Sequence, residues 1–292
     1  MFDIKMEVTR LKKGLVLEGG AMRGLFTAGI IDVLMEENIE LDGVIGVSAG
    51  ACFGCNYKSR QIGRTLRYNL KYCKDPRMSG IRSLLFTGDI YGAEFCYRDI
   101  PKKLDIFDTK TFTDSPVEFH VVATDVNTGL PAYHKCTDGG DNDLDWIRAS
   151  ASMPLVSRIV DVDGRQLLDG GISDSVPLKY YQSIGYDRNL VILTRPRGYI
   201  KEKNKMLPLM RIRLRKYPNL LIAMENRHND YNESIKYIWD AEKKGTTFVL
   251  CPDEELPINR VEHNPDRIQN VYDIGRQTAM KNLDKIKEFF SQ

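Results

Sequence analysis

The sequence predicts an α/β fold built around a mainly parallel sheet, and three observations support that prediction. An apolar run at 14–17 (GLVL) leads into glycines, as a buried strand before a tight turn does. Apolar residues then recur at every third or fourth position over 21–38, which is the spacing of an amphipathic helix. A second apolar run at 42–47 (DGVIGV) leads into another helical pattern over 49–66. Strand, helix, strand, helix in this order is typical of parallel βαβ units.

The remaining elements follow from the same patterns. The run 119–126 (FHVVATDV) predicts a third strand, and 131–135 (PAYHK) predicts its hairpin partner. The segment 138–145 (DGGDNDLD) predicts a polar loop, while 75–115 shows no clear period. Further expected elements are two short strands within 159–171 around the Asp163-Gly164 turn, strands at 189–194 and 246–251, a helix at 230–244, and one or two helices over 264–290.

The composition is that of an ordinary globular protein of 292 residues, with 42% apolar and 28% charged side chains. The net charge of +2 is too small to indicate nucleic-acid binding, so no nucleic-acid partner is expected. Residues 1–14 have no apolar centre, which predicts no secretory signal, and no apolar run reaches the length of a membrane span. Six cysteines without a disulfide-framework spacing indicate a reducing, cytoplasmic compartment.

Ser48 lies in the stretch Gly46-Val-Ser-Ala-Gly50, directly after an apolar run and before a helical pattern. A serine between two glycines in this context is typical of a nucleophile elbow, because the glycines let the strand turn sharply into the helix. The start of that helix would add amide donors and positive potential beside the hydroxyl. The same five residues also suit a plain strand-to-helix turn or a phosphate site, so the motif alone leaves these alternatives open.

The histidines do not supply an obvious base for this serine. In α/β-hydrolases the nucleophile is followed in the chain by an acid and then by a histidine. His228 and His263 come late enough, but neither ends a strand-like run, and only one predicted strand precedes the strand that leads into Ser48. We therefore expect a carboxylate base, since a partly desolvated carboxylate gains basicity.

Two Asp-Gly-Gly turns offer such a carboxylate. The turn at 138–140 lies in an acidic loop whose spacing fails the calcium-loop pattern, and we interpret it as a solvated turn. The turn at 169–171 follows Leu167-Leu168, the end of a predicted strand, which makes Asp169 the candidate base. The alternative for Asp169 is again a simple turn, because Asp-Gly pairs are common in turns.

The run Gly19-Gly20-Ala21 offers backbone amides at the start of a helix, which is where an oxyanion needs donors. Arg23 adds a positive charge beside it. A dinucleotide-binding turn is the alternative, but alanine at position 21 breaks the full G-x-G-x-x-G pattern. In parallel sheets the active crevice lies outside the carboxyl ends of the strands, so this loop, Ser48 and Asp169 should meet at one edge.

Three segments together, EGGAMRGLFTAGII, GVSAG and LLDGGISDSVP, resemble the patatin-like phospholipases, in particular a bacterial branch of that family. The resemblance covers 14–195 and implies a three-layer α/β/α sandwich with a serine–aspartate dyad that hydrolyses acyl esters. It also implies no cofactor, no metal ion and no need for calcium. The remaining residues, 196–292, are expected to form a C-terminal strand and helical extension packed on this core.

The resemblance assigns roles to individual residues. Ser48 is expected to be the nucleophile, Asp169 the base, and the amides of Gly19, Gly20 and Ala21 the oxyanion hole. The supporting residues implied by the motifs are Arg23, Gly46, Gly50, Gly170 and Gly171. The family usually has a third glycine where this chain has Ala21, and the β-carbon of alanine resists a positive φ angle.

The sequence says less about the substrate, the binding partners and the alternative functions of this fold. A lipid or fatty acyl ester is the expected substrate, while an acyltransferase, a thioesterase or a binding module without turnover are the alternatives. The basic stretch 201–216, with apolar residues interleaved, suits peripheral contact with anionic lipid at the inner membrane surface or a merely charged surface segment. Its alternating arginines are typical of a half-buried strand. Cys52 and Cys55 are expected to be small core residues rather than zinc ligands.

Overall fold

A computed structural model describes residues 10–291, and its centre is one sheet of eight strands. Seven of them run in the order β5-β6-β3-β2-β1-β7-β8, and β4 pairs with β3. The contacts among β3, β2, β1, β7 and β8 are parallel, whereas β4, β5 and β6 pair antiparallel. The strands are β1 (Lys13–Leu17), β2 (Gly43–Val47), β3 (Glu118–Asp125), β4 (Pro131–Cys136), β5 (Val160–Val162), β6 (Arg165–Asp169), β7 (Arg188–Ile192) and β8 (Thr247–Leu250).

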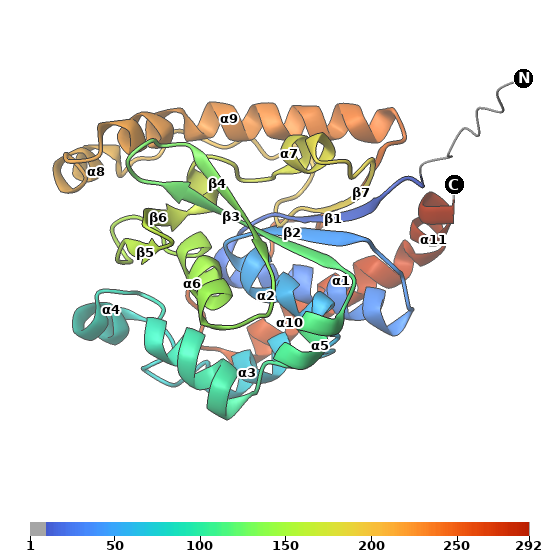
Figure 1. Cartoon of the computed structure of the whole chain (residues 1–292), viewed down its shortest axis with the longest axis horizontal. Coiled ribbons are helices and arrows are strands. Elements are labelled where there is room, and N and C mark those ends of the chain that lie inside the picture. The colour runs from blue at the N-terminus through green and yellow to red at the C-terminus, as the bar shows by residue number, and fades with distance from the viewer. Residues whose placement is uncertain (1–9, 292) are drawn as a thin grey trace, which may run out of the picture.

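Helices cover both faces of this sheet, so the predicted three-layer α/β/α architecture is confirmed (Figure 1). One face carries α7 (Leu178–Ser183) and α9 (Pro218–Lys243), and the other carries α1 (Gly24–Glu36), α2 (Ala49–Lys58) and α10 (Pro265–Lys281). Side chains of β1 alternate between the two layers: Leu15 and Leu17 join the core beside α1, and Val16 joins the core beneath α9. Burial on both faces explains why the central strands are continuous apolar runs.

The packing of α1 against α10 is unusually close. A β-carbon on Gly29 would collide with the carbonyl of Tyr272, and one on Gly275 would collide with the carbonyl of Phe26. The Tyr272 hydroxyl also donates a 2.6 Å hydrogen bond to Asp32 of α1. The C-terminal part of the chain is therefore built into the same scaffold as its first helix.

Smaller helices fill the connections. They are α3 (Arg64–Tyr72), α4 (Ile81–Thr87), the π-helix η2 (Phe95–Leu104), α5 (Thr109–Asp114), α6 (Asp141–Ser150), α8 (Leu207–Arg213) and α11 (Leu283–Ser291), with the 3₁₀ turns η1 (Ala21–Arg23) and η3 (Gly170–Ile172). Within the described range, none of the helices is both long enough and apolar enough to cross a membrane.

Several sequence expectations need correction. The alternating arginines of 201–216 do not form a strand, because residues 207–213 form α8. The expected polar loop at 138–145 is wrong in its second half, where α6 begins at Asp141. The second helical run breaks between α2 and α3, where Arg60 and Gly63 adopt positive φ angles of 55° and 72°. The expectation that residues 1–14 carry no secretory signal falls mostly on residues 1–9, which lie outside the described residues.

Candidate active site

Ser48 occupies a sharp, strained turn between β2 and α2. Its φ and ψ angles are 55° and −120°, a conformation that costs a non-glycine residue about 1–3 kcal/mol. The turn is held by a hydrogen bond of 2.8 Å from the Ser48 amide to Oγ of Ser150. Ser150 in turn donates a 2.5 Å hydrogen bond to the carbonyl of Val122 on β3. The strained turn is therefore fixed to the neighbouring strand, as a preorganised nucleophile requires.

The two flanking glycines are required by close backbone contacts. A β-carbon on Gly46 would lie 2.5 Å from the carbonyl oxygen of Gly50, across the turn. One on Gly50 would lie 2.6 Å from the carbonyl oxygen of Leu17 at the end of β1. Any side chain at either position would push α2 away from the strands and change the position of the serine.

Asp169 reaches the serine by a route that the sequence did not predict. Residues of β3 up to Val122 pair with β2, and the following residues, from Ala123, pair with β6. The ends of β2 and β6 thus meet along one edge of β3, with Val47 opposite Val122 and Asp169 opposite Ala123. Because β6 runs antiparallel to β3, Asp169 does not lie at the carboxyl end of a parallel strand, contrary to the expectation from the sequence.

The carboxyl group of Asp169 is buried, and burial raises its pKa. Arg227, the hydrogen bond with Ser48, the amide of Gly171 and the charge of Lys201 all act in the opposite direction. The Gly171 amide lies 2.8 Å from Oδ1 of Asp169 and fixes its orientation. The effect of burial outweighs these opposing effects, so the Asp169 carboxylate is more basic than that of an exposed aspartate.

The loop after β1 passes directly against the serine. A β-carbon on Gly19 would lie 2.9 Å from Cβ of Ser48, so only glycine allows this approach. Among the described hydrogen bonds, none is donated by the amides of Gly19 or Gly20. Ala21 adopts a positive φ of 50°, the conformation that its β-carbon disfavours. Unpaired amides beside Ser48 are what a tetrahedral oxyanion would need.

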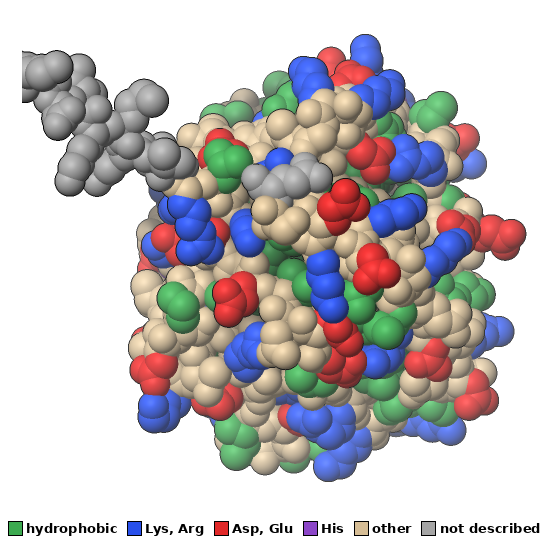
Figure 2. Space-filling view, turned by 90° about the vertical axis from the view of Figure 1, so that its right-hand side faces the viewer, with side chains coloured by type: hydrophobic (Ala, Val, Ile, Leu, Met, Phe, Trp, Pro, Cys, Tyr) green, Lys and Arg blue, Asp and Glu red, His purple; other side chains and the backbone are tan. Residues whose placement is uncertain are grey.

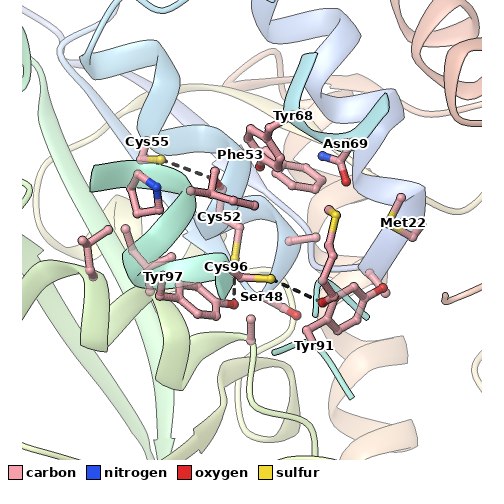
Figure 3. A pocket seen from close by; sticks show the side chains of 18 of the residues that line it. Met22, Ser48, Cys52, Phe53, Cys55, Tyr68, Asn69, Tyr91, Cys96 and Tyr97 are labelled. Atoms are coloured by element: carbon pink, nitrogen blue, oxygen red, sulfur yellow. Dashed lines mark hydrogen bonds between the residues drawn. The ribbon is translucent and has the colours of Figure 1, made fainter. Parts of the chain in front are cut away.

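An apolar cavity of about 110 Å³ opens beside Ser48 (Figure 3). It lies between α2, α3 and η2, and its lining includes Ser48, Cys52, Phe53, Tyr68, Cys96 and Tyr97. Cys52 therefore faces a cavity, although it was expected in the core, and its Sγ lies 3.6 Å from the Tyr97 hydroxyl. Cys55 is buried as expected, and all six cysteines are free thiols.

The histidines are engaged elsewhere. Within residues 10–291, no histidine side chain has a hydrogen bond to Ser48 or Asp169. His120 pairs with Glu118 and His134 pairs with Asp143, while His263 contacts the carbonyl of Cys73. A histidine-based triad therefore has no support in this geometry.

His134, Cys136 and Asp143 form a group whose ligand atoms lie within 4.8 Å of one another. One oxygen of Asp143 is already bonded to His134, and the other accepts amides of Thr137, Asp138 and Gly139. We interpret Asp143 as the acceptor that orders the turn before α6. The expectation of a solvated turn at 138–140 is therefore incomplete, because amides of this turn donate hydrogen bonds to the buried carboxylate of Asp143.

Two site residues were not identified from the sequence. Ser150 lies in a small-residue stretch (RASAS) that carries no chemical pattern of its own. Arg227 lies on α9, where its Nε donates to the carbonyl of Gly171 beside Asp169. Nothing in the sequence pattern around position 227 indicates that it lies beside a residue 58 positions earlier.

Comparisons with known proteins agree with the fold and the motifs. Residues 15–180 match the family model described as patatin-like phospholipase. Residues 217–291 match a domain of unknown function, DUF6363.

Individual relatives are more distant. An uncharacterized protein YjjU of Escherichia coli is 32% identical over 188 residues, which cover 62% of this chain and 52% of that protein. A lysophospholipase nte1 of Aspergillus oryzae is 25% identical over 82% of this chain, but only 14% of its own length is covered. The chain thus spans about half of the first relative and far less of the second. Among solved structures, VipD of Legionella pneumophila covers 94% of this chain and 67% of its own, with a TM-score of 0.46 and 13% identity.

Proposed function

The chain belongs to the patatin-like phospholipase family, and from that premise we propose that it is a serine acyl hydrolase that cleaves carboxylic esters of lipids. In this proposal Ser48 and Asp169 form the catalytic dyad. The observation that carries it is the meeting of β2 and β6 along one edge of β3, which brings the buried Asp169 carboxylate to the strained Ser48.

The proposed reaction begins with attack of Ser48 Oγ on the ester carbonyl while Asp169 accepts the hydroxyl proton. The amides of Gly19, Gly20 and Ala21 stabilise the tetrahedral oxyanion, an effect that can contribute about 3–4 kcal/mol per donor. Collapse of this intermediate breaks the C–O bond, and Asp169 returns the proton to the leaving alcohol. Water then attacks the acyl-enzyme while Asp169 takes its proton. The bond between the acyl carbon and Ser48 Oγ breaks, Asp169 returns the proton to Ser48 Oγ, and the acid is released.

The apolar cavity beside Ser48 supports a fatty acyl group as the part of the substrate that it holds. Its lining is mostly aromatic, aliphatic and sulfur-containing, with few polar groups to bind a charged acid portion. An acyl chain placed there would bury methylene groups, each of which contributes about 0.8 kcal/mol.

We further propose that the protein works at an anionic membrane surface in a reducing compartment such as the cytoplasm. Helix α4 exposes Ile81, Leu85 and Phe86 at 74%, 76% and 83%, next to Arg82. The helix lies between Met78 and Tyr91, two residues that line the cavity, so a membrane that binds α4 would be next to its opening. Basic and apolar side chains on one short helix are the combination that favours anionic lipid.

Helix α8 at the same end of the molecule in Figure 1 has a similar character, with Leu209 and Ile212 exposed among arginines. The face at the opposite end differs: Figure 2 shows acidic and basic side chains interspersed, with only separate small apolar areas. The end that carries α4 and α8 is therefore the surface we assign to lipid contact.

A fluorophosphonate probe tests the dyad directly, because it labels only an activated serine. The wild-type protein should be labelled, Ser48→Ala should not, and Asp169→Asn should react at least about a hundredfold more slowly. Variants of His228 and His263 to alanine serve as controls and should keep most of the labelling rate. Unchanged labelling in Ser48→Ala, or its loss in either histidine variant, would refute this assignment.

A further inference from the structure

Four half-buried cations gather beside the dyad, and none of them lines the apolar cavity. Within the turn Ala21–Arg23, the first two residues line the cavity, whereas Arg23 does not. The cation cluster consists of Arg23, Arg195, Lys201 and Arg227. Three of these residues lie outside the matched patatin-like region, and Arg227 belongs to the domain of unknown function.

Tyr231 on α9 links the members of the cluster. The ammonium of Lys201 lies 4.2 Å from the centre of the Tyr231 ring. The Tyr231 ring meets Tyr199 edge to face, and the guanidinium of Arg195 lies 4.5 Å from the Tyr199 ring. Arg227 lies one helical turn before Tyr231 and bonds the backbone carbonyl of Gly171, next to the proposed base. The cations are therefore held in place by aromatic side chains and backbone contacts.

The acidic groups nearby balance this charge only in part. Both oxygens of the buried Glu18 accept hydrogen bonds, one from the Tyr231 hydroxyl at 2.8 Å and the other from the amide and hydroxyl of Thr194, and its charge raises the pKa of both Arg23 and Lys201. Glu255 pairs with Arg195 at 2.8 Å, but its side chain is 70% exposed, so water screens this contact. Asp169 is reserved for the reaction in the proposed mechanism.

The cluster also contains an unmet hydrogen-bond donor. Nε of Arg23 is buried and has no partner among the described residues. Burial and the neighbouring Arg195 lower the pKa of Arg23, and burial with Arg227 lowers that of Lys201 to about 8. Cations that repel one another, one of them with an unmet donor, are stabilised when an anion joins them.

We propose, building on the ester hydrolase function above, that this cation cluster binds a phosphate group on the alcohol side of the substrate. The acyl chain then lies in the apolar cavity, the ester lies at Ser48, and the phosphate lies between Arg23, Arg195 and Lys201. A phosphate monoester suits the site because its charge approaches two and its oxygens accept from several arginine and lysine donors at once. The C-terminal region thereby selects the leaving group of the reaction.

The test compares two substrates with the same acyl chain, lysophosphatidic acid and monoacylglycerol, both below their micelle-forming concentrations. For the wild-type protein, kcat/KM should favour the phosphate-bearing ester at least about tenfold, as expected for a charge-assisted contact. Lys201→Gln should lower this ratio about tenfold through KM, and Lys201→Arg should largely restore it. Lys281→Gln, which removes an exposed charge on α10, is the matched control and should leave the ratio unchanged.

Inorganic phosphate distinguishes a headgroup site from a site for a free anion. It should inhibit lysophosphatidic acid hydrolysis competitively, and less strongly in Lys201→Gln than in the wild-type protein. Stimulation of monoacylglycerol hydrolysis by phosphate would overturn the proposal in favour of an effector site. Equal ratios in the wild-type and Lys201→Gln proteins would overturn it while leaving ester hydrolysis intact. Absence of both hydrolysis and serine labelling would overturn the proposed function together with this inference.

Discussion

The amide of Ser48 donates a 2.8 Å hydrogen bond to Oγ of Ser150, and this contact fixes the strained turn that carries the proposed nucleophile. Ser150 is completely buried, and its hydroxyl also bonds the carbonyl of Val122. The position of one serine hydroxyl thus depends on another serine 102 residues later in the chain.

Ser150→Ala should slow serine labelling and ester hydrolysis at least about tenfold, because a small displacement of a nucleophile is costly. It should also lower the free energy of unfolding by about 1–3 kcal/mol, since a buried amide and a carbonyl lose their partner. Ser59→Ala is the matched control: this buried serine follows the last residue of α2 and loses a 3.0 Å hydrogen bond to Gln61. Equal labelling rates for the two variants at equal stability would exclude a positioning role for Ser150.

Ala21→Gly should increase the free energy of unfolding by up to about 1 kcal/mol, because glycine adopts the observed φ of 50° without strain. The amide that we assign to the oxyanion hole remains, so the rate of ester hydrolysis should change by less than about threefold. Denaturant unfolding and steady-state kinetics measure both effects. Ala28→Gly, within α1, is the control and should destabilise the protein by about 1 kcal/mol. A tenfold loss of activity in Ala21→Gly would show that the alanine itself is needed.

Tyr68→Ala should shift the substrate preference toward longer acyl chains, since it removes an aromatic ring from the cavity lining. One methylene in a hydrophobic pocket changes kcat/KM by about tenfold or more, so a series of p-nitrophenyl esters resolves the shift. Tyr68→Phe keeps the ring and should keep the wild-type optimum. The same optimum in all three proteins would place the acyl chain elsewhere.

Phe86→Ser should reduce binding to vesicles that contain phosphatidylglycerol by about tenfold or more, because the fully exposed ring would otherwise be buried in lipid. Co-sedimentation with such vesicles measures the effect, and vesicles of phosphatidylcholine alone should bind the wild-type protein less. Met280→Ser removes an exposed apolar side chain from α10 and is the control. Equal binding of the Phe86 and Met280 variants would argue against α4 as a lipid-contacting helix.

Asp32 should make the protein less stable as the pH rises. Burial raises its pKa to about 6, despite the hydrogen bonds from Tyr272 and the amide of Gly63. The folded state therefore favours the protonated carboxyl group, and this stability is lost as the pH rises from about 4 through about 6. Asp32→Asn should narrow the difference in unfolding free energy between pH 5 and pH 7.5. Parallel pH profiles for the two proteins would mean that Asp32 does not titrate in this range.

The sequence predicted the parts of the fold that depend on local patterns. Apolar runs followed by glycines located β1 and β2, and the Asp-Gly pair at 163–164 located the β5–β6 turn, where both residues have positive φ angles. The G-x-S-x-G spacing likewise placed Ser48 on its turn. In each of these cases the residues that determine the conformation are neighbours in the chain.

What the sequence could not predict depends on distant contacts. The edge of β3 that β6 joins, and its direction, follow from pairing between segments more than 40 residues apart. Part of the cavity wall comes from 75–115, where a π-helix containing Pro101 has no simple apolar period. The half-buried cations on or near α9 look like ordinary surface charges until the helix is placed over the sheet. These features have no signature in a local window of sequence.

The contact between α1 and α10 joins two parts of the chain that are made far apart in time during synthesis. Asp32 follows the proposed oxyanion loop closely, yet its partner Tyr272 is made 240 positions later. The ribosome releases Ser48 and Asp169 well before the helix that covers α1, so the apolar face of α1 stays open in the nascent chain. The scaffold around the first helix is thus completed only after the C-terminal part of the chain has been made.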